Sequence, residues 1–191
     1  MDKSTFLTEN KKYSRLWQNG YKPANWERLA KALTGRIDPH GKTLMDFGFG
    51  KGNALDFFEN RGFRVVGVEV SDFAVEAQRL RNREVYHSSL DNLSFLNDNY
   101  CNIGFCNDVI EHLPEELVVP SLGEIFRTCS DYLFLSVCPN HSHHLSLDGE
   151  NLHLTVKPKE WWEEQFSKLG KVEELKFRFS RSLRYSIKLS K

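Results

Sequence analysis

The stretch TLMDFGFGKGNALDFFENRGFRVVGVEV, residues 43–70, joins two apolar runs through a glycine-rich turn and a short amphipathic segment. The two runs, Thr43–Phe47 and Arg64–Glu69, have the length and apolar content of buried strands. The segment after the glycines has apolar residues at helical spacing. This order of elements predicts two parallel strands connected by a helix.

The same alternation continues along the chain. Further runs of strand length are Glu84–His87, Ile103–Asn107 and Tyr132–Val137. Two more, Val172–Phe179 and Leu183–Leu189, are separated only by a short polar link, which predicts an antiparallel pair. The pattern therefore predicts a doubly wound α/β fold with a seven-stranded, mostly parallel sheet, an antiparallel C-terminal strand pair and helices on both faces.

Helical spacing of apolar residues marks the segments between these runs. It is clear in Trp26–Leu33 and in Leu122–Cys129. A later helix is predicted to begin at Pro158, to bury Trp162 and to end at Gly170.

Composition limits the partners and the compartment. Lysine plus arginine and aspartate plus glutamate both number 26, so no overall positive charge favours binding to nucleic acid. The four cysteines lie in or beside apolar runs and lack the spacing of a zinc site, which indicates reduced thiols in a cytoplasmic protein. No segment approaches eighteen continuous apolar residues, so we expect a soluble protein without membrane insertion.

The glycine-rich turn is predicted to bind a ligand. Gly48, Gly50 and Gly52 allow a ligand to lie directly against the backbone, beyond the carboxyl end of a strand. The nicotinamide fingerprint requires a glycine at the position of Asn53. The carboxylate of Asp46 would repel a pyrophosphate but attract an ammonium group. An NAD(P)-dependent oxidoreductase is therefore the weaker alternative.

The order of these residues, Asp46-Phe-Gly48-Phe-Gly50-Lys-Gly52, resembles motif I of the class I (Rossmann-like) methyltransferases that use S-adenosylmethionine. The resemblance covers about residues 43–140 and is closest to the small-molecule branch that modifies quinones and sugars. It also rests on four further stretches: GVEVSDFAVEAQ (67–78), SSLDNLSF (88–95), FCNDVIEHLPEE (105–116) and LSVCPN (135–140).

The resemblance implies where S-adenosylmethionine would lie. Glu69 would accept hydrogen bonds from both ribose hydroxyls, and Asn107 would border the methionine end. The adenine contact stays open between Ser89 and Asp91. Aromatic side chains such as Trp17 would attract the sulfonium. The expected cofactor-binding residues are Asp46, Phe47, Gly48, Phe49, Gly50, Gly52, Glu69, Val70, Ser89, Leu90, Asn107 and Tyr13.

The expected reaction is methyl transfer by in-line displacement to an oxygen or nitrogen, less readily a carbon, of a small molecule. The chain is expected to be one domain, a monomer or homodimer, with an N-terminal helical lid (1–40), a cofactor-binding core (41–140), and an acceptor loop, helix and strand pair (141–191). A non-catalytic partner protein that binds the adenosyl cofactor is a second alternative. A nucleic-acid methyltransferase is disfavoured because no Asn/Asp-Pro-Pro-aromatic motif follows Asn107.

Histidines are the candidate catalytic residues, because an oxygen or nitrogen acceptor usually has to lose a proton near neutral pH. Four histidines cluster between residues 141 and 153, and one of His143 or His153 is the predicted general base. His112 is a third candidate, with a supporting role in its turn as the alternative. A metal site completed by Asp148 or Glu150 is an alternative for this histidine-rich segment, but none is predicted.

Overall fold

The sheet predicted from the sequence is present. The computed structural model describes residues 1–22, 26–146, 148–178 and 180–190. These residues form a seven-stranded sheet in the order β3-β2-β1-β4-β5-β7-β6. The first five strands in this order are parallel, β7 is antiparallel to β5, and β6 is antiparallel to β7. The strands are β1 (Thr43–Phe47), β2 (Arg64–Glu69), β3 (Glu84–His87), β4 (Cys101–Asn107), β5 (Cys129–Val137), β6 (Gly170–Glu174) and β7 (Leu183–Leu189).

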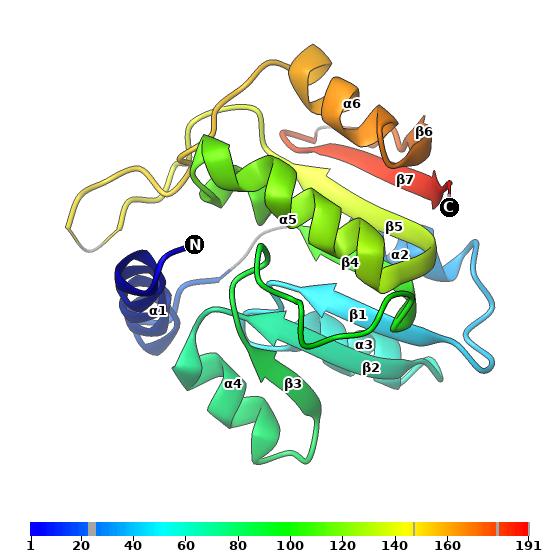
Figure 1. Cartoon of the computed structure of the whole chain (residues 1–191), viewed down its shortest axis with the longest axis horizontal. Helices are drawn as coiled ribbons and strands as arrows, with labels where there is room; N and C mark the ends of the chain where they lie inside the picture. The colour runs from blue at the N-terminus through cyan, green and yellow to red at the C-terminus, as the bar shows by residue number, and fades with distance from the viewer. Residues whose placement is uncertain (23–25, 147, 179, 191) are drawn as a thin grey trace.

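Helices cover both faces of the sheet (Figure 1). α5 and α6 bury their apolar residues on one face, and α2 and α3 bury theirs on the other. The predicted fold class is therefore confirmed. The helices are α1 (Lys3–Gln18), α2 (Trp26–Thr34), α3 (Asn53–Glu59), α4 (Asp72–Arg79), α5 (Glu115–Thr128), α6 (Lys159–Ser167) and the 3₁₀ helix η1 (Ile110–His112).

The strand order reverses next to β1. From β1 the chain adds β2 and β3 on one side and then crosses to add β4 and β5 on the other. Parallel strands at such a reversal leave a crevice beyond their carboxyl ends, because the connections leave in opposite directions. The turn after Phe47 and the end of β4 at Asn107 therefore lie side by side and form the floor of the site.

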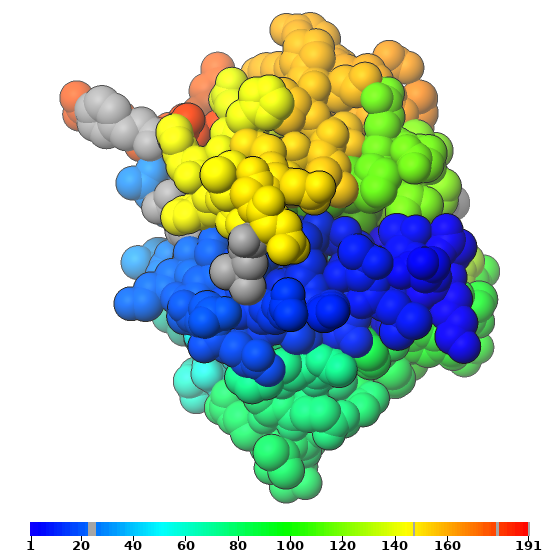
Figure 2. All heavy atoms as spheres, turned by 90° about the vertical axis from the view of Figure 1, so that its left-hand side faces the viewer, coloured from blue at the N-terminus to red at the C-terminus, as the bar shows by residue number. Residues whose placement is uncertain are grey.

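α1 and the segment 141–153 lie over this carboxyl edge. Figure 2 shows the first residues of the chain, in blue, between the segment 141–153, in yellow, and α4, in green. Tyr21 packs edge-on against His144, with ring centroids 5.3 Å apart. The hydroxyl of Ser14 lies 2.8 Å from that of Ser71, at the start of α4.

Three strands, β4, β5 and β6, begin two or three residues earlier than predicted. β5 begins at Cys129, which the helical pattern had placed on the preceding helix, and Cys129 pairs with Cys101 at the start of β4. The apolar run that predicts β5 begins only at Tyr132, because the polar residues Ser130 and Asp131 occupy strand positions. Asp131 pairs with Lys42 at 2.8 Å, so its side chain is partnered without ending the strand.

The C-terminal antiparallel pair is confirmed, with shifted bounds. β6 spans Gly170–Glu174 rather than Val172–Phe179, and Phe179 lies outside the described residues. Gly170 is not the residue at which α6 ends, because the helix stops at Ser167. A Cβ at Gly170 would lie 2.1 Å from the Lys188 carbonyl oxygen, so close strand approach explains this glycine.

No α-helix in the described part of the chain is both long and apolar enough to cross a lipid bilayer. The four cysteines are described, and no disulfide joins any of them to another described residue. Three of them are buried, whereas Cys138 is half-buried at the end of β5.

Trp162 provides a test of the packing of α6 on the sheet. Its side chain is fully buried, stacks on Phe166 and donates from Nε1 to the Lys157 carbonyl at 3.2 Å. We expect Trp162→Ala to lower the free energy of unfolding by about 3–5 kcal/mol. The neighbouring Trp161 is half-buried, so Trp161→Ala should cost clearly less in the same urea denaturation experiment. Equal losses in the two variants would contradict this packing.

Candidate cofactor and acceptor site

A cavity lies at the carboxyl edge of the sheet, where the strand order reverses. It is lined by the turns after β1, β2 and β3, the end of β4, η1, α1 and the segment that follows β5. Most of the predicted cofactor residues line it: Asp46, Gly48, Phe49, Gly50, Glu69, Val70, Ser89, Leu90, Asn107 and Tyr13. The structure therefore brings together residues that come from five separate parts of the sequence.

The carboxylate of Glu69 ties two turns of the cavity floor together. Its Oε2 accepts from the backbone N–H of Gly50 at 2.8 Å. Its Oε1 accepts from the N–H groups of Val70 and Ser71, each at 3.0 Å. Burial raises the pKa of this carboxyl, and the three backbone hydrogen bonds oppose the rise. A carboxylate has about four lone-pair sites, so acceptor capacity remains for a ligand hydroxyl.

Asp46 places a second buried carboxyl in the same cavity. It is 3% exposed. Burial, and then the nearby Glu69, raise its pKa well above the ordinary value. A cationic ligand group would favour the ionised form of Asp46 and offset both effects. The pair thus fits a ligand that carries an ammonium group and hydroxyls.

Two of the predicted cofactor residues do not line the cavity. Phe47 is fully buried in the core between the sheet and α5. Gly52 has a left-handed φ of 83°, and a Cβ there would lie 2.5 Å from the side chain of Gln78. The alternating glycines predict a turn that binds a ligand. At Gly52, however, the missing side chain makes room for Gln78 of α4. Phe47 and Gly52 therefore support the site through packing.

Gly50 accommodates α1 as well as the turn. Its φ is 55°, and a Cβ would lie 2.8 Å from the ring of Trp17. The Trp17 ring is buried, and its Nε1 has no hydrogen-bond partner among the described residues. α1 thus covers the glycine turn, and Trp17 is one of the residues that line the cavity.

The structure distinguishes Ser89 from Asp91, the two candidates for the adenine contact. Ser89 is buried and lines the cavity, whereas Asp91 is not one of the lining residues. Leu90, between them, is also buried against the cavity. Of the two, Ser89 is therefore the residue that borders the cavity.

All three candidate catalytic histidines line the cavity. His112 and His153 have ring centroids 4.8 Å apart at 77°. The Tyr13 hydroxyl hydrogen-bonds to Nδ1 of His112 at 2.8 Å. Burial, followed by His153 and Lys12, lowers the pKa of His112 to about 3, so its ring is neutral at physiological pH. His143 is exposed at the cavity mouth.

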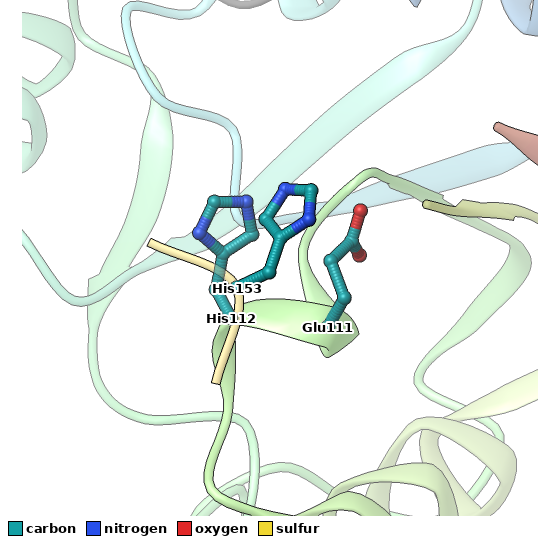
Figure 3. Close-up of side chains that lie close together, drawn as sticks. All are labelled: Glu111, His112 and His153. Carbon is teal, nitrogen blue, oxygen red and sulfur yellow. The ribbon is translucent and has the colours of Figure 1, made fainter. Parts of the chain in front are cut away.

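Glu111 is a residue that the sequence analysis did not assign to the site. Its side chain is fully buried, and Oε1 accepts from the backbone N–H of Cys138 at 2.9 Å. Figure 3 shows Glu111 and His112 rising from η1 beside His153, which comes from the neighbouring segment. One ligand atom from each of the three lies within 4.8 Å of the others. Asp148 and Glu150, the carboxylates considered as ligands of the alternative metal site, are exposed and lie outside this cluster.

Residues 45–131 match the family described as "Methyltransferase domain". These residues are a methyltransferase domain. The matched range contains the glycine turn, Glu69 and η1. The predicted enzyme class, a methyltransferase, is thereby confirmed. No match was found among curated protein sequences.

Solved structures share this fold at low sequence identity. The 1,6-didemethyltoxoflavin-N1-methyltransferase of Burkholderia thailandensis, with bound 1,6-didemethyltoxoflavin and S-adenosylhomocysteine, is 15% identical, with 98% of this chain and 87% of that chain covered and a TM-score of 0.69. Magnesium protoporphyrin IX methyltransferase from Synechocystis is 15% identical, with 99% and 100% covered and a TM-score of 0.73. A small RNA methyltransferase is 22% identical, with 86% and 25% covered and a TM-score of 0.65.

Replacing Glu69 tests its role as a bridge between the turns. In Glu69→Gln the amide nitrogen must face at least one backbone N–H, which leaves a buried donor unpaired at a cost of about 1–3 kcal/mol. We expect a lower free energy of unfolding in urea and weaker binding of S-adenosylhomocysteine by calorimetry. Glu116→Gln, at an exposed position of α5, is the matched control and should change neither quantity. Wild-type stability in Glu69→Gln would refute the bridging role.

Proposed function

We propose that this methyltransferase transfers a methyl group from S-adenosylmethionine to an oxygen or nitrogen atom of a small molecule. The observation that carries the proposal is that the predicted cofactor residues and the histidine-rich segment line one cavity. Asp46 and Glu69 lie on its floor, whereas His143 and His153 come from the segment after β5. A cofactor on the floor would therefore present its methyl group to an acceptor held beside the histidines.

The chemistry requires placement more than covalent participation by the protein. A lone pair of the acceptor forms the new bond to the methyl carbon as the carbon–sulfur bond breaks and its electrons stay on sulfur. The acceptor's proton must also leave. Holding the two reactants in line contributes up to roughly 7–11 kcal/mol to lowering the barrier. The cover formed by α1 supports this role because it limits the orientations of both reactants.

The enclosure of the site favours a small acceptor. Trp17 and Tyr13 of α1 line the cavity together with His141 and Ser142 of the segment after β5. The formal charges of the chain sum to zero, which gives no general attraction for a polyanion. Two of the similar solved structures are named for small-molecule acceptors, although one is named for small RNA.

The proposed enzyme is one domain with three functional portions. Residues 1–40 act as the lid, 41–140 as the cofactor-binding core and 141–191 as the acceptor portion of one domain. The chain works as a monomer or homodimer in the cytoplasm. Its catalytic role is preferred to that of a non-catalytic partner because the cavity holds acceptor-side as well as cofactor-side residues.

Binding and turnover measurements test the proposal together. Calorimetry should show binding of S-adenosylmethionine and S-adenosylhomocysteine but not of NAD. Incubation with methyl-labelled cofactor and a panel of phenols, amines, sugars and short RNAs should transfer label to a small molecule. Cofactor binding without any transfer would support the non-catalytic alternative, and transfer only to RNA would overturn the small-molecule assignment.

Asp46 predicts a pH dependence of cofactor binding. Its pKa is raised in the free protein, whereas the ammonium of a bound cofactor would stabilise its charged form. Below the raised pKa, binding must therefore release a proton, and affinity should increase as the pH rises through this range. Calorimetry in two buffers with different ionisation enthalpies measures the proton released. Asp46→Asn should bind more weakly and release fewer protons; unchanged release would contradict the assignment.

His143 is the proposed general base. It lines the cavity and is exposed, so a proton taken from the acceptor can pass on to water. His112 is neutral but too weakly basic for this role. We expect His143→Ala to reduce turnover by roughly 10²-fold or more if proton removal limits the rate. Affinity for S-adenosylhomocysteine should remain unchanged, and unchanged turnover would remove His143 from the mechanism.

A further inference from the structure

The cluster of Glu111, His112 and His153 contains a buried polar atom that nothing described in the chain satisfies. The Glu111 side chain is fully buried, and its Oε2 has no hydrogen-bond partner among the described residues. A proton on this oxygen would not satisfy it, because that proton would itself lack an acceptor. An unpaired buried carboxyl oxygen is costly and calls for a physical explanation.

The surroundings of Glu111 also concentrate negative charge. The carboxyl of Asp108 is close enough to Glu111 for the two groups to interact electrostatically. Among the charged groups that face Asp108 are Arg184, on β7, and His153. Asp108 has a left-handed φ of 51° at the end of β4, and Ser136 Oγ donates to its Oδ1 at 2.8 Å. Strained residues of this kind concentrate at functional sites.

The hydrogen bond of His153 orients this residue as a ligand. A carbonyl oxygen can only accept, so the 2.5 Å contact between His153 Nδ1 and the Asn140 carbonyl places the proton on Nδ1. Nε2 of His153 then carries the free lone pair, as in most histidine ligands of metals. His112 is held by the Tyr13 hydroxyl at Nδ1 and by the Leu152 carbonyl, and an ion would replace one of these partners.

The geometry points to a site for one divalent first-row transition ion, bound by Glu111, His112 and His153. Two ligands on one ion, with bonds of about 2.1 Å, lie at most about 4.2 Å apart. The ligand atoms here lie within 4.8 Å of one another, so a small inward movement of the side chains closes the site. Two imidazoles and one carboxylate favour ions such as Mn²⁺, Fe²⁺, Co²⁺ or Zn²⁺ over Mg²⁺ or Ca²⁺, which prefer oxygen.

The ion has a defined role if the proposed function holds, and this step rests on it. All three ligands line the cavity shared with the predicted cofactor residues, and three ligands leave coordination positions open. An acceptor hydroxyl bound there would ionise more readily, because the cation stabilises the oxygen anion. Its proton would pass to His143 or water, and the oxygen would then attack the methyl carbon. The ion therefore favours an oxygen acceptor over a nitrogen acceptor.

Metal binding is testable without any acceptor or cofactor. The chain is first treated with a chelator, and Mn²⁺ is added while free Mn²⁺ is followed by electron paramagnetic resonance. Visible absorption on addition of Co²⁺ gives a second measurement. We expect one ion per chain. Glu111→Gln and His153→Asn should each weaken Mn²⁺ binding at least about 10-fold. His40→Asn removes an exposed histidine outside the cavity and should bind Mn²⁺ as the wild type does.

Calorimetry with S-adenosylhomocysteine separates this inference from the proposed function. If the variants still bind S-adenosylhomocysteine, a loss of Mn²⁺ binding reflects the ligands and not misfolding. His153→Asn changes a half-buried loop residue and keeps the test valid if Glu111→Gln does not fold. Absence of Mn²⁺ and Co²⁺ binding, or unchanged binding in His153→Asn, would overturn the metal site and leave the proposed function standing. Binding of Mn²⁺ by a chain that transfers no methyl group would support the metal site and contradict the proposed function.

Discussion

The hydrogen bonds of Glu69 are the constraint on which the cavity depends. One carboxylate joins the turn after β1, through Gly50, to the turn after β2, through Val70 and Ser71. These turns follow neighbouring parallel strands and lie at the same edge of the sheet. Without a shared acceptor, three backbone N–H groups, two of them buried, would lose their partner. The residue expected to bind the ribose therefore also builds the surface on which a ribose would lie.

α1 depends on that surface. Trp17 reaches the glycine turn only because position 50 has no Cβ, and Tyr13 reaches η1 through its hydrogen bond to His112. Ser14 connects the same helix to Ser71, whose own N–H is held by Glu69. One helix thus contacts the cofactor side and the acceptor side of the cavity. Movement of α1 would alter both sides together, which is a suitable arrangement for coupling substrate entry to enclosure.

The order of strands and helices was predictable from the sequence. Parallel strands that are buried on both faces of the sheet consist of continuous apolar runs, which are visible in the sequence. The bounds were less predictable where polar residues sit in strands. The polar residues Ser130 and Asp131 interrupt the apolar pattern in the first part of β5. Gly170 resembled the end of a helix, although a glycine is needed there because β7 lies so close. In each case the deciding contact comes from a distant segment, such as Lys42 or Lys188, which local patterns do not reveal.

Part of the candidate site was likewise predictable from the sequence, and part was not. The glycine turn and Glu69 form a local motif, so their placement at the cavity followed from short-range order. Glu111 lies in the stretch FCNDVIEHLPEE that carries part of the resemblance, but this stretch does not predict that Glu111 is buried or that it approaches His153. The fold buries it with one oxygen unpaired beside Asp108. Such disagreement between a residue's own preference and its environment is concentrated at functional sites, because packing alone gives no reason to bury a second acid there.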